Sequence, residues 1–160
     1  MKLGTFMMPL HPPKRQPWET YIEDREAILL ADKLGYQEAL VGEHVTDLAE
    51  NVTSCAMFLA SLVSETKQIV LGTGTVNMPN SHPAAIAAQV AMLDHMAQGR
   101  LNFGVAASGL PSDWAMFNVD GMSGQHREMT RESLDIILRL WSDEPEFDYK
   151  GKYWHVTKTG

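Results

Sequence analysis

Four short apolar segments, each separated from the next by a helical pattern, limit the possible folds of this chain more than any other feature. They begin near residues 2, 38, 68 and 101. This spacing is close to the roughly 30 or more residues that one βαβ unit needs. Continuous apolar strands that alternate with helices form a parallel sheet covered by helices, so the sequence predicts the α/β class. The predicted strands are Lys2–Met8, Glu38–Val41, Gln68–Gly74 and Leu101–Val105.

The segments between the strands have apolar residues at the spacing of a helix face. In the first of these segments, the predicted buried stripe is Ala27, Leu30, Ala31 and Leu34. In the last, it is Leu134, Ile137, Leu138 and Trp141. The predicted helices are Trp18–Leu34, Asn51–Ser64, a third that starts at Pro83, and His126–Trp141, with a long loop at Ser108–Gly124 and a hairpin or extended tail at Phe147–Val156.

Two α/β architectures compete for this pattern, the doubly wound open sheet and the (β/α)8 barrel. A doubly wound dinucleotide-binding sheet carries a G-x-G-x-x-G motif after its first strand. The corresponding segment here, Met7–Pro12, contains no glycine, which favours the barrel. A barrel usually needs about 250 residues, and the chain has 160. We therefore expect residues 1–160 to be the N-terminal part of a single barrel domain, with about its first four β/α units, rather than a natural half-barrel.

The composition excludes several other classes. The net charge of −7 lacks the basic footprint on which nucleic-acid binding relies. No apolar run reaches the roughly 20 residues that span a bilayer, and the N-terminus lacks the regions of a signal peptide. Cys55 is the only cysteine, so no internal disulfide can form, and a reducing cytoplasmic location is expected.

The carboxyl ends of barrel strands carry function, and histidines follow three of the predicted strands. His44 comes just after the second strand and is the strongest candidate for a catalytic group. Glu43 would point to the face opposite His44 if the strand continued. A structural role is therefore as well supported for Glu43 as a catalytic one. His11 and His82 lie beside prolines in loops, where a structural role is the commoner one.

Methionines and small residues complete the predicted strand ends. Met7, Met8 and Met78 would form a soft apolar pocket wall. Gly72, Gly74 and Thr75 end the third strand, and glycines there mark a close approach by a ligand or by another backbone. The small residues Ala106, Ala107, Ser108 and Gly109 repeat this pattern after the fourth strand. Two such ends would leave room for a large flat ligand, although tight packing within a barrel would also require small residues.

Several segments of the chain, in their order and spacing, resemble a known family. They are Lys2–Met8 (KLGTFMM), Leu40–Asp47 (LVGEHVTD), Val70–Pro83 (VLGTGTVNMPNSHP), Leu93–Gly104 (LDHMAQGRLNFG), Gly109–Asp120 (GLPSDWAMFNVD) and the tail Arg131–Trp154. Together they are similar to the N-terminal half of the bacterial luciferase-like flavin-dependent monooxygenases, and within that family to the limonene and diketocamphane monooxygenase type.

The resemblance implies a (β/α)8 barrel that binds reduced FMN delivered by a separate flavin reductase. Enzymes of this family react the flavin with O2 to a C4a-hydroperoxide and transfer one oxygen atom to an organic substrate. A small hydrophobic substrate would suit the methionine wall. The resemblance also implies a partner subunit, in a homodimer or a luciferase-like heterodimer, because the apolar stripe of Asn51–Ser64 beside the helix Pro83–Met96 fits the dimer interface of the family. Alternatively, the missing half of the barrel covers this stripe. It implies neither a metal, nor a nucleic acid, nor a membrane.

The resemblance assigns roles to particular residues. The family's histidine after the second strand corresponds to His44, which would act near the flavin as acid and base. A non-prolyl cis peptide would fall at about Gly74-Thr75. Luciferase binds the flavin phosphate with an arginine in the turn after the fourth strand, where this chain has Ala106, Ala107 and Ser108, so Ser108 and backbone N–H groups would have to replace it. The implied flavin-binding residues are Gly74, Thr75, Val76, Ala106, Ser108 and Gly109, and the implied substrate-pocket residues are Met7, Met8, His11 and Met78.

The sequence also leaves room for different functions. A metal-dependent barrel hydrolase could use His11, Glu43, His44 and His82 as ligands. The familiar barrel hydrolases, however, carry a His-x-His motif on the first strand, and this chain has none. A deazaflavin-dependent dehydrogenase of the same fold, a flavin-binding barrel without catalysis and an inactive half-barrel also agree with the pattern of strands and helices.

Overall fold

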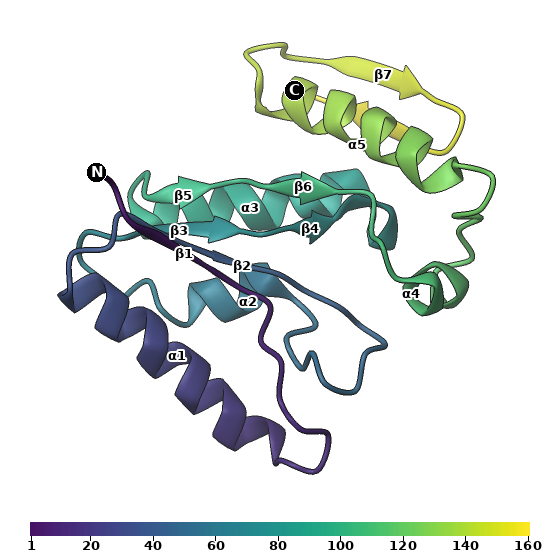
Figure 1. Cartoon of the computed structure of the whole chain (residues 1–160). Helices are drawn as coiled ribbons and strands as arrows, with labels where there is room; N and C mark the ends of the chain where they lie inside the picture. The colour runs from purple at the N-terminus through teal and green to yellow at the C-terminus, as the bar shows by residue number, and fades with distance from the viewer. The chain divides into compact units, whose positions relative to one another are not determined.

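The structure is a computed structural model that describes residues 1–160, and the chain divides into two compact units (Figure 1). The first unit contains Met1–Val76 and Met92–Val105, and the second contains Asn77–Ala91 and Ala106–Gly160. Each unit has its own cluster of buried hydrophobic residues. That the whole chain forms part of one barrel domain therefore stays a prediction.

The first unit is built on a parallel sheet with the order β1-β2-β3-β5. Its strands are β1 (Gly4–Met7), β2 (Glu38–Val41), β3 (Val70–Thr73) and β5 (Leu101–Asn102). Every strand pairs with its predecessor in the sheet, whereas a doubly wound sheet reverses its order at a switch point. Parallel strands laid down in sequence order are the winding of a (β/α)8 barrel, and the predicted architecture is confirmed.

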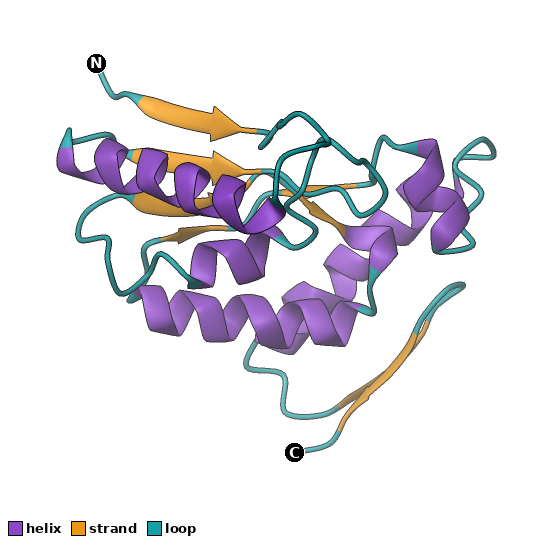
Figure 2. Ribbon diagram, turned by 90° about the horizontal axis from the view of Figure 1, so that it is seen from below, coloured by secondary structure: helices purple, strands orange, loops and turns teal.

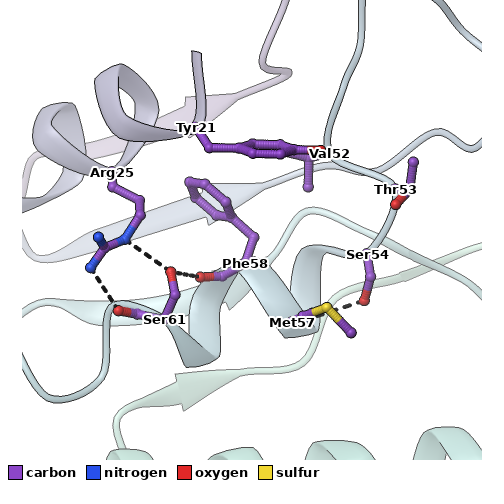
Figure 3. A pocket seen from close by; sticks show the side chains of 8 residues that line it. All are labelled: Tyr21, Arg25, Val52, Thr53, Ser54, Met57, Phe58 and Ser61. Atoms are coloured by element: carbon purple, nitrogen blue, oxygen red, sulfur yellow. Dashed lines mark hydrogen bonds between the residues drawn. The ribbon is translucent and has the colours of Figure 1, made fainter. Parts of the chain in front are cut away.

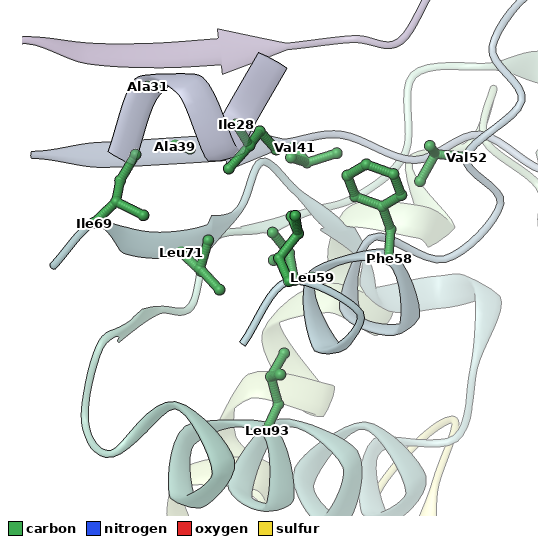
Figure 4. Packing of buried hydrophobic residues seen from close by; sticks show 11 residues of the cluster. Ile28, Ala31, Ala39, Val41, Val52, Phe58, Leu59, Ile69, Leu71 and Leu93 are labelled. Carbon is green, nitrogen blue, oxygen red and sulfur yellow. The ribbon is translucent and has the colours of Figure 1, made fainter. Parts of the chain in front are cut away.

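Helices cover one face of this sheet (Figure 2). They are α1 (Pro17–Lys33), α2 (Cys55–Ala60) and the C-terminal part of α3 (Pro83–Ala97). Ile28 of α1, Leu59 of α2 and Leu93 of α3 meet the side chains of β2 and β3 in one core (Figure 4). Fully burying a side chain of this size contributes about 1.5–3 kcal/mol, so this core holds the helices to the sheet.

The opposite face of the sheet carries Phe6, Leu40, Gly72 and Asn102, which lie in one row across the four strands. Successive side chains of a strand point to opposite faces, so this row alternates with the residues that face the helices. Phe6 is 60% exposed. In a closed barrel this face would be the interior.

The second unit joins helices to a β-hairpin. It contains α4 (Pro111–Met116), α5 (Gln125–Trp141), the short 3-10 helix η1 (Met78–Asn80) and the hairpin of β7 (Phe147–Lys150) and β8 (His155–Lys158). The carboxylate of Glu132 on α5 accepts the N–H groups of Lys152, Tyr153 and Trp154 in the hairpin turn. This single side chain ties the hairpin to the helix. The two-residue strands β4 (Val76–Asn77) and β6 (Val105–Ala106) lie where the chain passes from one unit to the other.

Several predicted boundaries are wrong for local reasons. The second helix is shorter than Asn51–Ser64, because the Ser54 hydroxyl accepts the Met57 N–H at 3.3 Å and so begins the helix at Cys55. The predicted loop Ser108–Gly124 contains α4, which starts with a proline at its first position. The fourth strand is divided into β5 and β6. The predicted hairpin near the C-terminus is confirmed.

The predicted faces of two helices are wrong in part. Ala31 of α1 and Ile137 of α5 are buried as predicted. Leu30 of α1 and Leu34, which follows the helix, are exposed, whereas Ile28 is buried. On α5, Leu138 and Trp141 are 55% and 40% exposed. The buried faces of these helices include polar residues that form hydrogen bonds or are small, and a count of apolar positions overlooks them. None of the helices combines the length and the apolar character that crossing a membrane needs.

Candidate active site

The carboxyl ends of β1, β2 and β3 converge at two glycines. The Gly42 N–H donates to the Met7 carbonyl at 2.9 Å, and the Gly74 N–H donates to the Val41 carbonyl at 2.6 Å. A Cβ atom on Gly42 would lie 2.1 Å from Met8 Sδ and 2.8 Å from the Gly74 carbonyl oxygen. The fold therefore brings Met8 and Gly74, which are far apart in the sequence, against the same glycine. The Gly74-Thr75 peptide bond is cis, as the resemblance implied.

Neighbouring strands occupy the space beside Gly74. A Cβ atom there would lie 3.0 Å from Leu40 Cβ and 3.2 Å from Cε2 of Phe6. The missing side chain at Gly74 thus lets two strands pack closely, which supports the packing interpretation of this glycine. Phe6 is not among the site residues predicted from the sequence. The alternation of side chains along the strand could have predicted its place, because it puts Phe6 on the face opposite Met7.

Met7 lies on the helix side of the sheet. It packs against the hydrophobic core and lines a groove of about 200 Å³ with Leu30 of α1 and with Leu34, which follows that helix. Met78 lies in η1 and is fully buried. Both placements favour a packing role, and a role in the substrate pocket stays a prediction for both residues.

His44 lies in the loop that follows β2. Its N–H donates to the Val52 carbonyl at 3.1 Å. Its Nε2 atom lies 3.8 Å from Oε2 of Glu50, and the two side chains are 18% and 17% exposed. The imidazole is thus largely shielded from water and has an acidic neighbour, which suits a group that exchanges a proton.

The preceding residue, Glu43, has a structural role in this loop. Its Oε2 atom accepts the N–H of Cys55 at 2.9 Å, at the first residue of α2. A carboxylate at a helix N-terminus satisfies a free N–H group and interacts favourably with the helix dipole. Burial raises the pKa of the Cys55 thiol, and the Glu43 carboxylate raises it further, so this thiol stays protonated and inert.

His11 contacts α1 through its side chain. Its Nε2 atom lies 3.0 Å and 2.9 Å from the two carboxylate oxygens of Asp24. Burial raises the pKa of Asp24, and the hydrogen bond from His11 opposes that rise. The imidazole is therefore held by a helix residue, and its assignment to the substrate pocket stays a prediction.

The turn after the fourth strand contains a buried hydroxyl group without a partner. Ser108 is 6% exposed with φ at +62°, and its Oγ atom makes no hydrogen bond within the chain. Its carbonyl accepts the Nε1–H of Trp114 at 3.2 Å. An unpaired buried polar atom is costly, so the Ser108 hydroxyl fits a ligand that offers it a hydrogen bond. At the next residue, Gly109, a Cβ atom would meet nothing within 4 Å.

His126 is a second buried polar residue near this turn, and it is not among the residues predicted from the sequence. Its ring lies 4.8 Å from the Trp114 ring, and its Nδ1 atom is buried and makes no hydrogen bond. In the sequence, His126 is the first residue of a predicted helix. Histidines at that position are commonly exposed, so nothing in the sequence indicated that this one is buried. Of the other predicted residues, Ala106 is partly buried and Val76 donates its N–H to the Gly104 carbonyl at 3.0 Å.

The candidate ligands of a metal-dependent hydrolase have other partners. His11 binds Asp24, Glu43 binds Cys55, and His82 accepts the Ala84 N–H at 3.2 Å through Nδ1. No cluster of three or more His, Cys, Asp or Glu side chains is placed to hold a metal ion.

The first unit has a further pocket, of about 310 Å³, between α1 and α2 (Figure 3). Its walls are mainly the Tyr21 and Phe58 rings. Arg25 lies at one end, where it donates hydrogen bonds to the hydroxyl and carbonyl of Ser61. None of the predicted site residues lines this pocket, which lies on the helix side of the sheet. The complete lining is Tyr21, Arg25, Val52, Thr53, Ser54, Met57, Phe58 and Ser61.

The winding of the sheet and the residues at its strand ends define a partial (β/α)8 barrel. A family model described as luciferase-like monooxygenase matches residues 1–160. The chain belongs to the luciferase-like monooxygenase family.

Individual relatives agree with this assignment. The chain is 38% identical to the 4-hydroxyprotoasukamycin monooxygenase of Streptomyces nodosus subsp. asukaensis, over 91% of this chain and 39% of that protein. It is 33% identical to the limonene 1,2-monooxygenase of Rhodococcus erythropolis, over 88% of this chain and 36% of that protein.

A solved structure also matches closely. It is the oxygenating constituent of 3,6-diketocamphane monooxygenase from Pseudomonas putida in complex with FMN, with a TM-score of 0.95 and 26% identity. That match covers 100% of this chain and 44% of the other. The chain thus spans less than half the length of the relatives it matches.

Proposed function

We propose that the protein that carries this chain is a flavin-dependent monooxygenase, which uses reduced FMN and O2 to oxygenate a small hydrophobic organic substrate. The observation that carries the proposal is the buried Ser108 hydroxyl without a partner, in the turn where flavin contacts are implied. Two further features support it: the family assignment and the likeness of the whole chain to an FMN-bound oxygenating constituent.

Reduced FMN, when bound, supplies the electrons and the chemistry that activates O2. The residues of this chain provide binding, exclusion of water and proton transfer. Ser108 and its neighbouring backbone would hold polar groups of the flavin. Phe6 and Leu40 lie beside Gly74, and Met8 lies beside Gly42. The apolar surface of these three side chains would keep water from the reacting centre. His44 would hold or move a proton at its imidazole, the side chain that most often serves as a general acid or base in enzymes.

The proposed partners follow from the same features. A separate reductase would supply the reduced flavin, because the FMN-bound relative is itself described as an oxygenating constituent. A second subunit, in a homodimer or a luciferase-like heterodimer, would cover α2, where Met57 is 76% exposed. A reducing cytoplasmic location suits a chain whose one cysteine is free and buried.

Isotope labelling tests the proposal. The full-length protein is given chemically reduced FMN, 18O2 and either limonene or a camphane diketone, the substrate types that the names of its relatives suggest. We expect one 18O atom in the organic product, detected by mass spectrometry. Release of hydrogen peroxide without any labelled product, across the whole panel, would overturn the proposal. Extraction of a deazaflavin in place of FMN would favour a dehydrogenase of the same fold.

A further inference from the structure

We propose that Glu50 is a positioning residue for His44, which fixes the orientation and the tautomer of its imidazole. The inference deepens the proposed function and rests on it for the role of His44. Glu50 Oε2 lies 3.8 Å from His44 Nε2, and both side chains are more than four-fifths buried. At this distance the two groups form an ion pair whenever the imidazole carries two protons. A small side-chain rotation brings the atoms to hydrogen-bonding distance, as often happens when a ligand enters a site.

The main chain on either side of Glu50 is held in place by residues from other elements. Glu50 forms an isolated antiparallel bridge with Leu10. Next to it, the Ala49 carbonyl accepts the His11 N–H at 2.8 Å, and the Asn51 carbonyl accepts the Tyr21 hydroxyl at 2.6 Å. The main chain at Glu50 is therefore fixed, and its side chain is only 17% exposed.

The same segment also fixes His44. The Val52 carbonyl, two residues after Glu50, accepts the main-chain N–H of His44 at 3.1 Å. One short segment therefore contacts His44 twice. Val52 binds its main-chain N–H, and the Glu50 carboxylate lies beside its ring. Groups held this way keep the geometry that a catalytic side chain needs.

The other acidic residues nearby have different partners. Glu43 accepts the Cys55 N–H, and Asp47 accepts the Ala49 N–H at 2.7 Å. On α1, Asp24 faces His11. Of these four acidic residues, Glu43, Asp47 and Asp24 face main-chain N–H groups or the His11 ring, and only Glu50 has its carboxylate beside the His44 ring.

A carboxylate at Nε2 has a specific chemical consequence. It accepts a hydrogen bond from Nε2–H, which favours the tautomer with its proton on that nitrogen and keeps the ring from turning. When the imidazole gains a second proton, the same carboxylate stabilises the resulting cation. Glu50 would thus act on the reaction through His44 and without touching the flavin or the substrate.

The first measurement is spectroscopic and needs no activity. The full-length protein is labelled with 15N-histidine, and two-bond 1H–15N spectra report the tautomer of each ring. We expect His44 to carry its proton on Nε2 in the native protein and to show a mixture of tautomers in Glu50→Gln. Glu50→Asp should restore the native tautomer in part. Asp47→Asn removes a charge from the same loop but keeps an oxygen that accepts the Ala49 and Glu50 N–H groups, so it should leave the His44 tautomer unchanged.

The second measurement is kinetic, with the substrate that turns over fastest in the 18O assay. We expect Glu50→Gln to lower kcat by about 10- to 100-fold, the usual effect of losing a residue that orients a functional imidazole, with KM changed by less than about threefold. His11, which pairs with Asp24 at 2.9 Å in the same unit as Glu50, serves as an internal reference: its unchanged signals in Glu50→Gln show that the variant is folded.

The outcomes separate the two proposals. An unchanged His44 tautomer in a folded Glu50→Gln protein overturns the positioning role, whatever the activity. A changed tautomer with native kcat leaves Glu50 as a partner of His44 and overturns the proton-transfer role that the proposed function gives His44.

Discussion

The Thr73 hydroxyl binds both main-chain polar groups of Gly104. Its Oγ1 atom donates to the Gly104 carbonyl and accepts the Gly104 N–H, each at 2.8 Å. Gly104 lies in the gap between β5 and β6, where the fourth strand is interrupted. A side chain on β3 thus replaces the missing ladder of hydrogen bonds. It fixes the ends of two strands immediately before Gly74.

Thr73→Val tests this arrangement, because valine has the shape of threonine without the hydroxyl. Thr73 is 1% exposed, so water cannot replace the two lost hydrogen bonds. We expect the free energy of unfolding to fall by about 1–3 kcal/mol, measured by urea denaturation. Thr73→Ser keeps the hydroxyl and should retain more of the stability than Thr73→Val. Equal stability of the valine variant and the native protein would contradict the assigned role.

Gly104→Ala tests the same contact from the other side. A Cβ atom on Gly104 would lie 2.2 Å from the Thr73 carbonyl oxygen, and this backbone atom cannot turn away. We expect a loss of about 1–3 kcal/mol in the free energy of unfolding, the usual cost of overpacking. Gly109→Ala is the matched control, since its Cβ would meet nothing within 4 Å, and its stability should stay within about 0.5 kcal/mol of native. A similar effect of both variants would mean that the contact with Thr73 does not determine the loss.

Asp32 gives a prediction that depends on pH. Burial opposes ionisation of its carboxylate, but hydrogen bonds from the N–H groups of Ile69, Gln68 and Lys67, and the charge of Arg100, outweigh burial and lower the pKa of Asp32. A carboxyl group with a lowered pKa stabilises the folded state above its unfolded pKa of about 3.9, and this contribution is lost as the pH falls through the folded pKa.

Asp32→Asn should therefore destabilise the protein at neutral pH by about 1–3 kcal/mol. The variant loses the negative charge and one of the two oxygens that accept the main-chain N–H groups. The difference from native should shrink progressively below about pH 4 as the native carboxyl is protonated. Urea denaturation at a series of pH values measures both effects. Asp135→Asn on the exposed face of α5 removes the same charge without these partners, and its stability should follow native at every pH. If Asp32→Asn lowered the free energy of unfolding by the same amount at every pH, the ionised carboxylate would not be the source of the stabilisation.

The sheet could be predicted from the sequence because buried parallel strands need unbroken apolar runs. The same runs place the strand ends, and with them His44, Met8 and Gly74. Glu50 could not be predicted this way, because the path of its loop is set by contacts with Leu10 and Tyr21, far away in the sequence.

The buried faces of the helices were missed for a related reason. Asp24 and Asp32 of α1 are buried, and they are satisfied by His11 and by the start of β3. Apolar periodicity describes a helix face only when burial follows hydrophobicity, so a face with polar residues that are paired through tertiary contacts resembles an exposed face in the sequence. Ser108 is the opposite case. From the sequence, its small side chain predicted only that this strand end has room for a ligand. The structure adds that its hydroxyl is buried without a hydrogen-bond partner.

Ser108→Ala tests whether that hydroxyl serves a ligand. In the absence of flavin the change removes an unsatisfied buried polar atom, so we expect the free energy of unfolding to stay level or rise. Affinity for FMN should fall by about 5- to 30-fold, which corresponds to one hydrogen bond of about 1–2 kcal/mol. Quenching of flavin fluorescence in the full-length protein measures the Kd. Ser123→Ala, at an exposed serine, is the control. Native affinity in Ser108→Ala would remove Ser108 from the flavin site.

His44→Ala, in the full-length protein with reduced FMN supplied, tests the group that the proposed chemistry needs most. A positioned acid or base contributes about 10²- to 10⁴-fold to a rate, so oxygenation of the organic substrate should slow by that order. Flavin affinity should change much less, because the His44 ring lies against Glu50 and its backbone is bound to Val52. The two quantities must be measured on the same preparation, the first as 18O-labelled product and the second as a Kd for FMN. Equal loss of both would identify His44 as a structural residue of the loop, and full turnover would remove it from the mechanism.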